Sequence, residues 1–141
     1  MSEPVKFPFL PVSSRTREVF LQPLLPFNLR RPGRETVLVH GLLDSGAAVN
    51  VLPYGLGLRL GAVWEAHTAR VTLTGNLFGH EARALLADAE IADFPPVRLV
   101  FAWVQSDSVP LLLGVNFFQE FDICFRRAAW SLNSSPQSNS R

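Results

Sequence analysis

An apolar segment of this 141-residue chain ends in residues that can do acid–base chemistry. Residues 37–43 (VLVHGLL) lead directly into Asp44, Ser45 and Gly46. An ionised carboxylate directly after so apolar a segment is costly unless it is hydrogen-bonded or paired with a second titratable group. A second copy of Asp44, related by a twofold axis, is one such partner. Asp44 is therefore the first candidate for chemistry.

Other reactive side chains point to no alternative site. His40, His67 and His80 share no ligand-like spacing with one another or with Cys124, so we expect no metal site. Ser45 lacks the glycine two positions earlier that a nucleophile elbow requires, which argues against a serine hydrolase. Cys124 is the single cysteine, so there is no internal disulfide. We expect no cofactor.

The elements around Asp44 divide into three parts. Residues 1–34 contain six prolines and are predicted to form extended segments at the periphery, with residues 19–21 and 24–25 as edge-strand pieces. Residues 35–132 are predicted to form one domain. Residues 133–141, rich in Ser and Asn, are predicted to be disordered.

Within the predicted domain, short β-like runs dominate and two short helices interrupt them. Pro53 and Gly61 favour a helix between them. Gly75-Asn76 between two alternating runs, 71–74 and 77–78, is typical of a hairpin turn. The other predicted strands are 48–52, 82–91, 97–104, 109–113 and 123–125 (extending toward 132), and the helices are 54–60 and 115–121. This pattern predicts an all-β fold.

Two motifs carry a resemblance to a known family. Asp44-Ser45-Gly46-Ala47, preceded by Leu42-Leu43, resembles the active-site signature of the retropepsin-like, single-lobe aspartic proteases. Much later in the chain, the run Leu111-Leu112-Leu113-Gly114-Val115 resembles the second signature of that family. The resemblance covers roughly residues 35–125 and includes a hairpin flap between the motifs, where residues 71–78 lie.

The resemblance implies a small closed all-β barrel with two short helices, active as a symmetric homodimer. It implies that Asp44 is catalytic and that the Ser45 hydroxyl forms a hydrogen bond across the twofold axis. It further implies that the active-site loop contains Ser45, Gly46 and Ala47. The substrate-binding flap would contain Thr74, Gly75 and Asn76, and the supporting second motif would contain Leu113 and Gly114.

The chain departs from many retroviral members at three positions. Ser45 stands where they usually have Thr, so the hydroxyl is kept and a methyl is lost. Ala48 and Val115 stand where many members pair an acidic residue with Arg. An apolar contact can replace a buried ion pair without loss of stability, so these changes affect the substrate and interface details rather than the catalytic group.

The chemistry implied is peptide-bond hydrolysis. Two carboxylates in contact cannot both ionise, so the pair holds one proton and supplies both an acid and a base. Because this chain has one candidate Asp, a complete site requires a homodimer with an isologous interface. The expected partners are a second copy and a peptide or protein substrate. The alternative is a non-catalytic homodimeric binding module on the same fold, since fold does not determine function.

Composition argues against other partners. The net charge is +1, so neither nucleic acid nor an acidic membrane is an expected ligand. No apolar run is long enough to span a bilayer as a helix. Charged residues make up 18%, below the roughly 25% of a typical soluble domain, which favours a covered subunit interface. The N-terminal residues do not have the pattern of a signal peptide, and we expect a cytoplasmic location.

Overall fold

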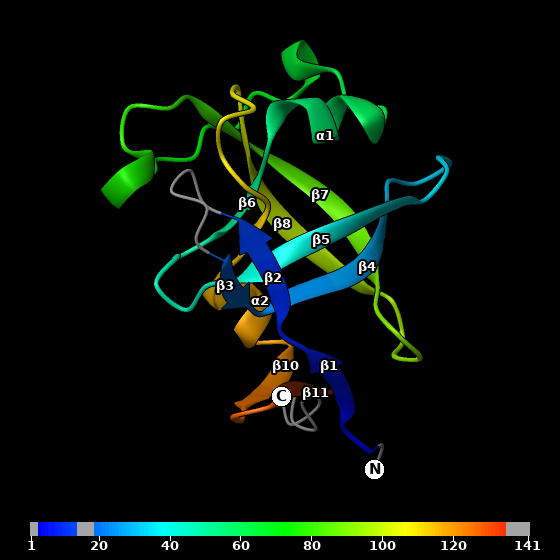
Figure 1. Ribbon diagram of the computed structural model, residues 1–141. Coiled ribbons are helices and arrows are strands. Elements are labelled where there is room, and N and C mark those ends of the chain that lie inside the picture. The colour runs from blue at the N-terminus through cyan, green and yellow to red at the C-terminus, as the bar shows by residue number, and fades with distance from the viewer. Residues whose placement is uncertain (1–2, 14–18, 135–141) are drawn as a thin grey trace.

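The computed structural model describes residues 3–13 and 19–134 and is built around a closed barrel (Figure 1). Six strands form it in the order β4-β5-β9-β6-β8-β7. Their bounds are β4 (Leu24–Arg30), β5 (Val37–Leu43), β6 (Asn50–Leu52), β7 (Ala82–Glu90), β8 (Val97–Val104) and β9 (Leu112–Leu113). The predicted all-β barrel is thus confirmed.

Two short α-helices accompany the barrel, as predicted. Helix α1 (Tyr54–Arg59) follows β6, and Gly61 just after it has a positive φ, a conformation that favours glycine. Helix α2 (Val115–Phe118) follows β9 and is shorter than the predicted 115–121. Two 3₁₀ turns, η1 (Trp64–Ala66) and η2 (Gly75–Leu77), lie in the segment between α1 and β7.

The order of the strands inserts the second motif next to the first. Strand β9 pairs in parallel with β5 and antiparallel with β6, so it lies between the two strands that flank the Asp44 loop. Strand β6 in turn pairs in parallel with β8. The loop that leaves β5 therefore has to pass over β9 before the chain returns in β6.

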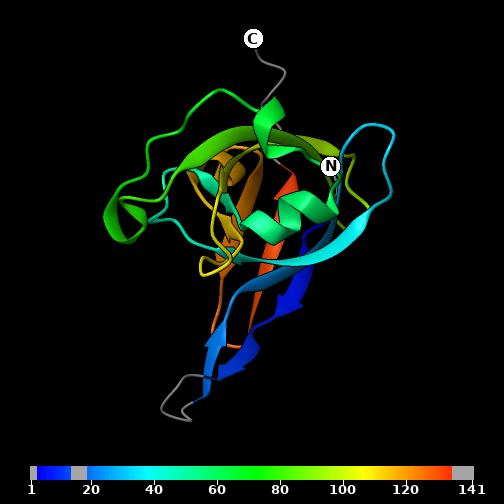
Figure 2. The same ribbon diagram turned by 90° about the horizontal axis from the view of Figure 1, so that it is seen from above.

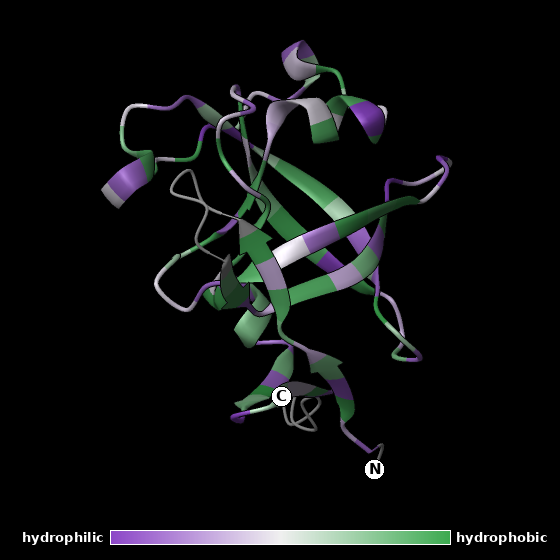
Figure 3. Cartoon of the chain, viewed as in Figure 1, coloured by the Kyte–Doolittle hydropathy of each residue, from purple (hydrophilic) through white to green (hydrophobic). Residues whose placement is uncertain are grey.

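The barrel interior explains why these segments form strands. Every second residue of β4 is buried (Leu25, Phe27 and Leu29), as expected for a strand with one face on the core. The barrel strands are largely hydrophobic, and hydrophilic residues gather in turns such as the one between β4 and β5 (Figure 3). Burial of this apolar surface is the main stabilising contribution to the fold.

The N-terminal part differs from its prediction. Residues 24–30 were expected at the periphery, but they form β4, which closes the barrel by pairing with both β5 and β7. Its apolar residues recur with period two despite Pro26, which is exposed, so the proline lies on the outer face of the strand. The number of prolines in residues 1–34 therefore did not predict which of these residues lie in the barrel.

The segments before β4 and after α2 form two smaller sheets. Strand β1 (Val5–Pro8) pairs with β11 (Ala129–Ser134), which pairs with β10 (Phe121–Phe125). Strands β2 (Leu10–Ser13) and β3 (Val19–Gln22) pair with each other. The single last strand predicted from 123 toward 132 is therefore a hairpin of two strands, and of the predicted tail 133–141 only the first two residues are described, at the end of β11.

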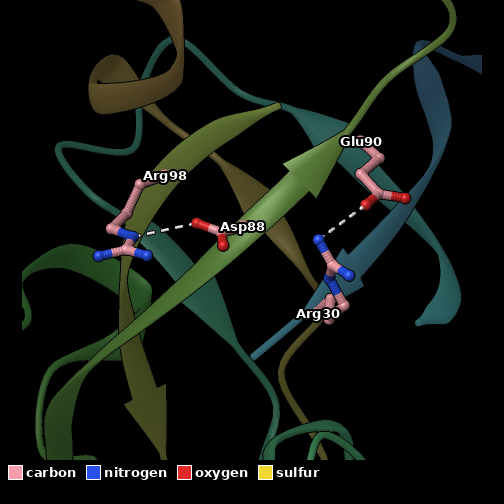
Figure 4. A network of polar contacts seen from close by, with 4 residues as sticks. All are labelled: Arg30, Asp88, Glu90 and Arg98. Carbon is pink, nitrogen blue, oxygen red and sulfur yellow. Dashed lines mark hydrogen bonds and ion pairs between the residues drawn. The ribbon is translucent and has the colours of Figure 1, made fainter. Parts of the chain in front are cut away.

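Polar pairs lie on the outer face of the barrel (Figure 4). Arg98 Nε donates to Asp88 Oδ1 at 3.0 Å, and this hydrogen bond raises the pKa of Arg98. Arg30 Nη2 lies 3.4 Å from Glu90 Oε2. Exposed ion pairs of this kind contribute little to stability, so the core rather than these pairs holds the barrel closed.

Gly57 lets helix α1 pack closely against the core, and a substitution at this position tests that contact. A Cβ at Gly57 would lie 2.2 Å from the buried indole of Trp103, whereas a Cβ at Gly55 would lie 3.0 Å from the exposed carboxylate of Asp107. Gly57→Ala is expected to lower the free energy of unfolding by about 1–3 kcal/mol because the ring has no room to move. Gly55→Ala, measured by urea unfolding as the matched control, is expected to change it by less than about 1 kcal/mol.

Candidate active site

Asp44 is placed by the strand that comes from the second motif. Its backbone N–H donates to the carbonyl of Leu113 at 2.9 Å, directly after the parallel pairs Leu42–Leu112 and Leu43–Leu113. Leu113 is fully buried, so the strand that accepts this hydrogen bond is anchored in the core. The two motifs, far apart in the sequence, are thus joined at the residue that carries the carboxylate.

The Asp44 carboxylate is held by the turn that follows it. Its Oδ1 accepts the Gly46 N–H at 2.9 Å, and its backbone carbonyl accepts the Ala47 N–H at 3.1 Å. Asp44 is half-buried, while Ser45 and Gly46 are exposed. The turn therefore presents the carboxylate at the surface of the isolated chain, in an orientation set by backbone hydrogen bonds.

Gly114 lets the second motif come very close to this turn. A Cβ at Gly114 would lie 2.4 Å from the carbonyl oxygen of Ala47 and 2.6 Å from that of Val49. The next residue, Val115, donates its N–H to the Ala47 carbonyl at 2.9 Å. Any larger side chain at position 114 would push the Asp44 loop away from the barrel.

Asn50 completes this arrangement, and sequence analysis missed it. Its side chain is fully buried; Oδ1 accepts the Gly114 N–H at 2.8 Å and Nδ2 donates to the Val100 carbonyl at 3.1 Å. Asn50 thus ties the end of the Asp44 loop to the second motif and to β8. The signal was present in the sequence, because Asn50 is the one polar residue in the apolar run 47–52.

The predicted hairpin turn at Gly75-Asn76 is wrong. A two-residue type I′ turn needs a positive φ at both central residues, but of these two only Gly75 has one. Gly75–Leu77 form the 3₁₀ turn η2, in which the Phe78 N–H donates to the Gly75 carbonyl at 3.1 Å, and neither 71–74 nor 77–78 is a strand. A wide loop takes the place of the predicted hairpin.

This loop, residues 72–81, is nevertheless anchored at its base by strand-like pairing. The Val71 N–H donates to the Ala82 carbonyl at 3.0 Å, and the Ala84 N–H donates to the Ala69 carbonyl at 2.8 Å. Arg70 and Arg83 form an isolated bridge between these bonds. The loop therefore projects from the start of β7.

A small cleft joins the projecting loop to the Asp44 loop. It has a volume of about 80 Å³, and its lining includes Gly46, Ala47 and Val49 on one side and Thr74 and Leu77 on the other. The structure thus brings Thr74 to the active-site loop, whereas Gly75 and Asn76 are exposed and do not line the cleft.

Potential metal ligands do not cluster in the part of the chain that the structure describes. Among residues 3–13 and 19–134, no three side chains of His, Cys, Asp or Glu come together as a ligand set. Within the same ranges, none of the helices has the length and hydropathy of a membrane-spanning segment. The chemistry available at the Asp44 turn is that of a carboxylate, a hydroxyl and backbone N–H groups.

The architecture recurs in solved structures. One is the crystal structure of a retropepsin-like aspartic protease from Rickettsia conorii, which aligns with a TM-score of 0.61 over 94% of this chain and 92% of that one, at 17% sequence identity. No family model matches the chain, and no curated protein matches it by sequence. The chain has a retropepsin-like fold, as the two motifs predicted.

Asn50 provides a test of how the loop is held. Asn50→Leu keeps the approximate volume but leaves the buried Gly114 N–H without its acceptor, which is costly, and also removes the donor to the partly buried Val100 carbonyl. We expect the free energy of unfolding to fall by about 2 kcal/mol or more. Asn76→Leu, at an exposed position, is the control and is expected to change it by less than about 0.5 kcal/mol. Equal effects would show that the buried amide does not hold the loop.

Proposed function

We propose that the protein is an aspartic endopeptidase in which the Asp44 carboxylates of two copies activate a water molecule. The observation that supports this most strongly is the placement of Asp44. Asp44 is half-buried and directly follows β5, and its backbone N–H donates to the Leu113 carbonyl. Gly114 and Val115 contact Ala47, three residues further along the same loop. This placement occurs in a fold shared with a retropepsin-like aspartic protease.

The single chain supplies only half of the required chemistry. Hydrolysis without a metal ion or a covalent intermediate needs one group to take a proton from water and another to give one to the substrate. Asp44 is the only carboxylate in the loop formed by residues 44–49. A twofold axis beside this loop would bring two copies of Asp44 together, and such a pair holds one proton between its members.

The reaction then runs through an acid and a base that exchange roles. The ionised Asp44 takes a proton from water, whose oxygen bonds to the carbonyl carbon of the peptide. The protonated Asp44 of the other copy gives its proton to the carbonyl oxygen, forming a tetrahedral intermediate. The first Asp44 then gives its proton to the amide nitrogen. At the same time, one hydroxyl of the tetrahedral intermediate gives its proton to the carboxylate of the second Asp44. The carbon–nitrogen bond breaks, and the pair again holds one proton.

A small cleft lies beside the Asp44 loop. The cleft is lined by small and apolar residues together with Thr72 and Thr74, and no charged residue lines it. Loop 72–81 lies across this cleft from the Asp44 loop and is the candidate cover for a bound substrate. The exposed Ser45 is placed in the turn where a hydroxyl could bond across the twofold axis.

Replacement of the carboxylate tests this proposal. Asp44→Asn keeps the shape of the side chain but removes the acid–base group, so cleavage of a mixed peptide library at about pH 4 to 7 is expected to fall by at least about 10³-fold. Asp93→Asn, an exposed Asp in the β7–β8 turn, is the control and is expected to cleave like the wild type.

Two outcomes would contradict the proposal. Cleavage by Asp44→Asn at the wild-type rate would assign the activity to another group. A wild-type protein that dimerises but cuts nothing in the library would favour the binding module instead.

A further inference from the structure

A second cleft lies along the edge of strand β7, and none of its lining residues belongs to the cleft beside the Asp44 loop. This edge cleft has a volume of about 350 Å³, which is within the range of small-ligand sites. Its lining includes Arg31, Pro32, His67, Leu86, Asp88 and Arg98. It therefore combines apolar surface with charged side chains.

One pair of backbone groups on β7 has no partner in this cleft. The Ala84 N–H donates to the Ala69 carbonyl, and the Ala84 carbonyl accepts from His67 Nδ1 at 3.3 Å, so Ala84 turns its backbone groups away from β8. Backbone direction alternates along a strand, so Leu86 and Asp88 face the same way. Asp88 pairs with β4, but within residues 3–13 and 19–134 neither a ladder pair nor a turn bond reaches the Leu86 N–H and carbonyl at this edge.

Pro32 explains why β4 leaves this pair open. Arg30 pairs with Asp88, and the same register carried two residues further would place Pro32 opposite Leu86. Proline has no N–H to donate to the Leu86 carbonyl. The chain instead enters the turn between β4 and β5, which projects from the barrel (Figure 2). The edge of β7 is therefore open over the width of a single residue.

The charged side chains of the edge cleft leave one positive charge uncompensated. Arg98 donates to Asp88, so the charges of these two residues offset each other (Figure 4). Arg31 is held in place because its Nη1 donates to the Gly61 carbonyl at 3.0 Å. None of the ion pairs formed among the described residues includes Arg31. The cleft is thus complementary to a ligand with one negative charge.

We propose that the edge cleft binds the C-terminal residue of a peptide whose last side chain is apolar. The N–H of that residue donates to the Leu86 carbonyl, and its carboxylate accepts the Leu86 N–H, as in an antiparallel pair. The Arg31 guanidinium supplies the opposite charge. A chain end suits an opening one residue wide, because the peptide has to leave the edge on one side only.

The exposed side chain of Leu86 accounts for the preference for an apolar last residue. It is 49% exposed, and side chains of directly opposed residues lie on the same face of a sheet. An apolar side chain on the bound residue would therefore cover Leu86 and remove apolar surface of both from water. This inference does not depend on catalysis by Asp44, so either can fail without the other.

The first test titrates acetyl-Ala-Ala-Leu into the wild-type protein and follows the backbone amides by NMR. The free acid is expected to shift the Leu86 amide resonance in a saturable manner and to leave that of the buried Val39, in β5, unchanged. The same peptide with a C-terminal amide lacks the charge and is expected to bind at least about tenfold more weakly. Isovalerate, a small carboxylate without a peptide group, is likewise expected to bind at least about tenfold more weakly.

A variant identifies the side chain that recognises the carboxylate. Arg31→Gln is expected to raise the dissociation constant of the free acid at least about tenfold. Arg59→Gln, an exposed arginine at the end of α1 that does not line the edge cleft, is the control and is expected to stay within about twofold of the wild type.

Several outcomes would overturn the inference. They are the absence of a saturable shift at Leu86, equal binding of the acid and amide peptides, and equal effects of the two arginine variants. Isovalerate binding as tightly as the peptide acid would show a site for small carboxylates and not for peptide ends. If Arg31→Gln does not fold, the comparison of the acid and amide peptides on the wild type still decides.

Discussion

The close contact between Gly114 and the loop after β5 is the constraint on which the candidate site depends. Backbone carbonyls of Ala47 and Val49 occupy the space that a side chain at position 114 would need, so the loop and the second motif can only lie where they do if that residue is glycine. Hydrogen bonds from the Asp44 N–H to Leu113 and from the Val115 N–H to Ala47 act on either side of this contact. Together they fix the Asp44 backbone, while the Gly46 N–H orients the carboxylate through its hydrogen bond to Oδ1.

This constraint explains both what one chain achieves and what it lacks. The barrel strands β5, β9 and β6 support the Asp44 loop, and the buried Asn50 joins the far end of this loop to β8 and to Gly114. The result is one well-positioned carboxylate at the surface, which is not sufficient for hydrolysis without a metal ion. In the proposed symmetric dimer the second copy would supply the second carboxylate, and a covered subunit interface would account for the low share of charged residues, 18%.

Sequence reasoning succeeded where a short motif has a direct backbone consequence. The apolar strand that leads into Asp44 and the boundaries of α1 follow from local rules and were found. Gly114 was singled out by the resemblance of its segment to a family motif rather than by a local rule. It failed where distant pairing decided the outcome. Strand β4 is in the barrel because β5 and β7 both pair with it, and Gly75 starts a 3₁₀ turn because its neighbours have no strand partner at 72–81. The role of Asn50 could not be predicted locally, because its hydrogen-bond partner, the Gly114 N–H, lies far away in the sequence.

The most direct test of the central claim mixes wild-type chains with an excess of Asp44→Asn chains under conditions that allow subunit exchange. If each site is built from two copies of Asp44, the cleavage rate per wild-type chain falls in proportion to the fraction of wild-type chains that still pair with one another. Asp93→Asn chains added in the same excess should leave the rate per active chain unchanged. A rate per wild-type chain that is independent of added Asp44→Asn would show that one chain carries a complete site, which would contradict the account.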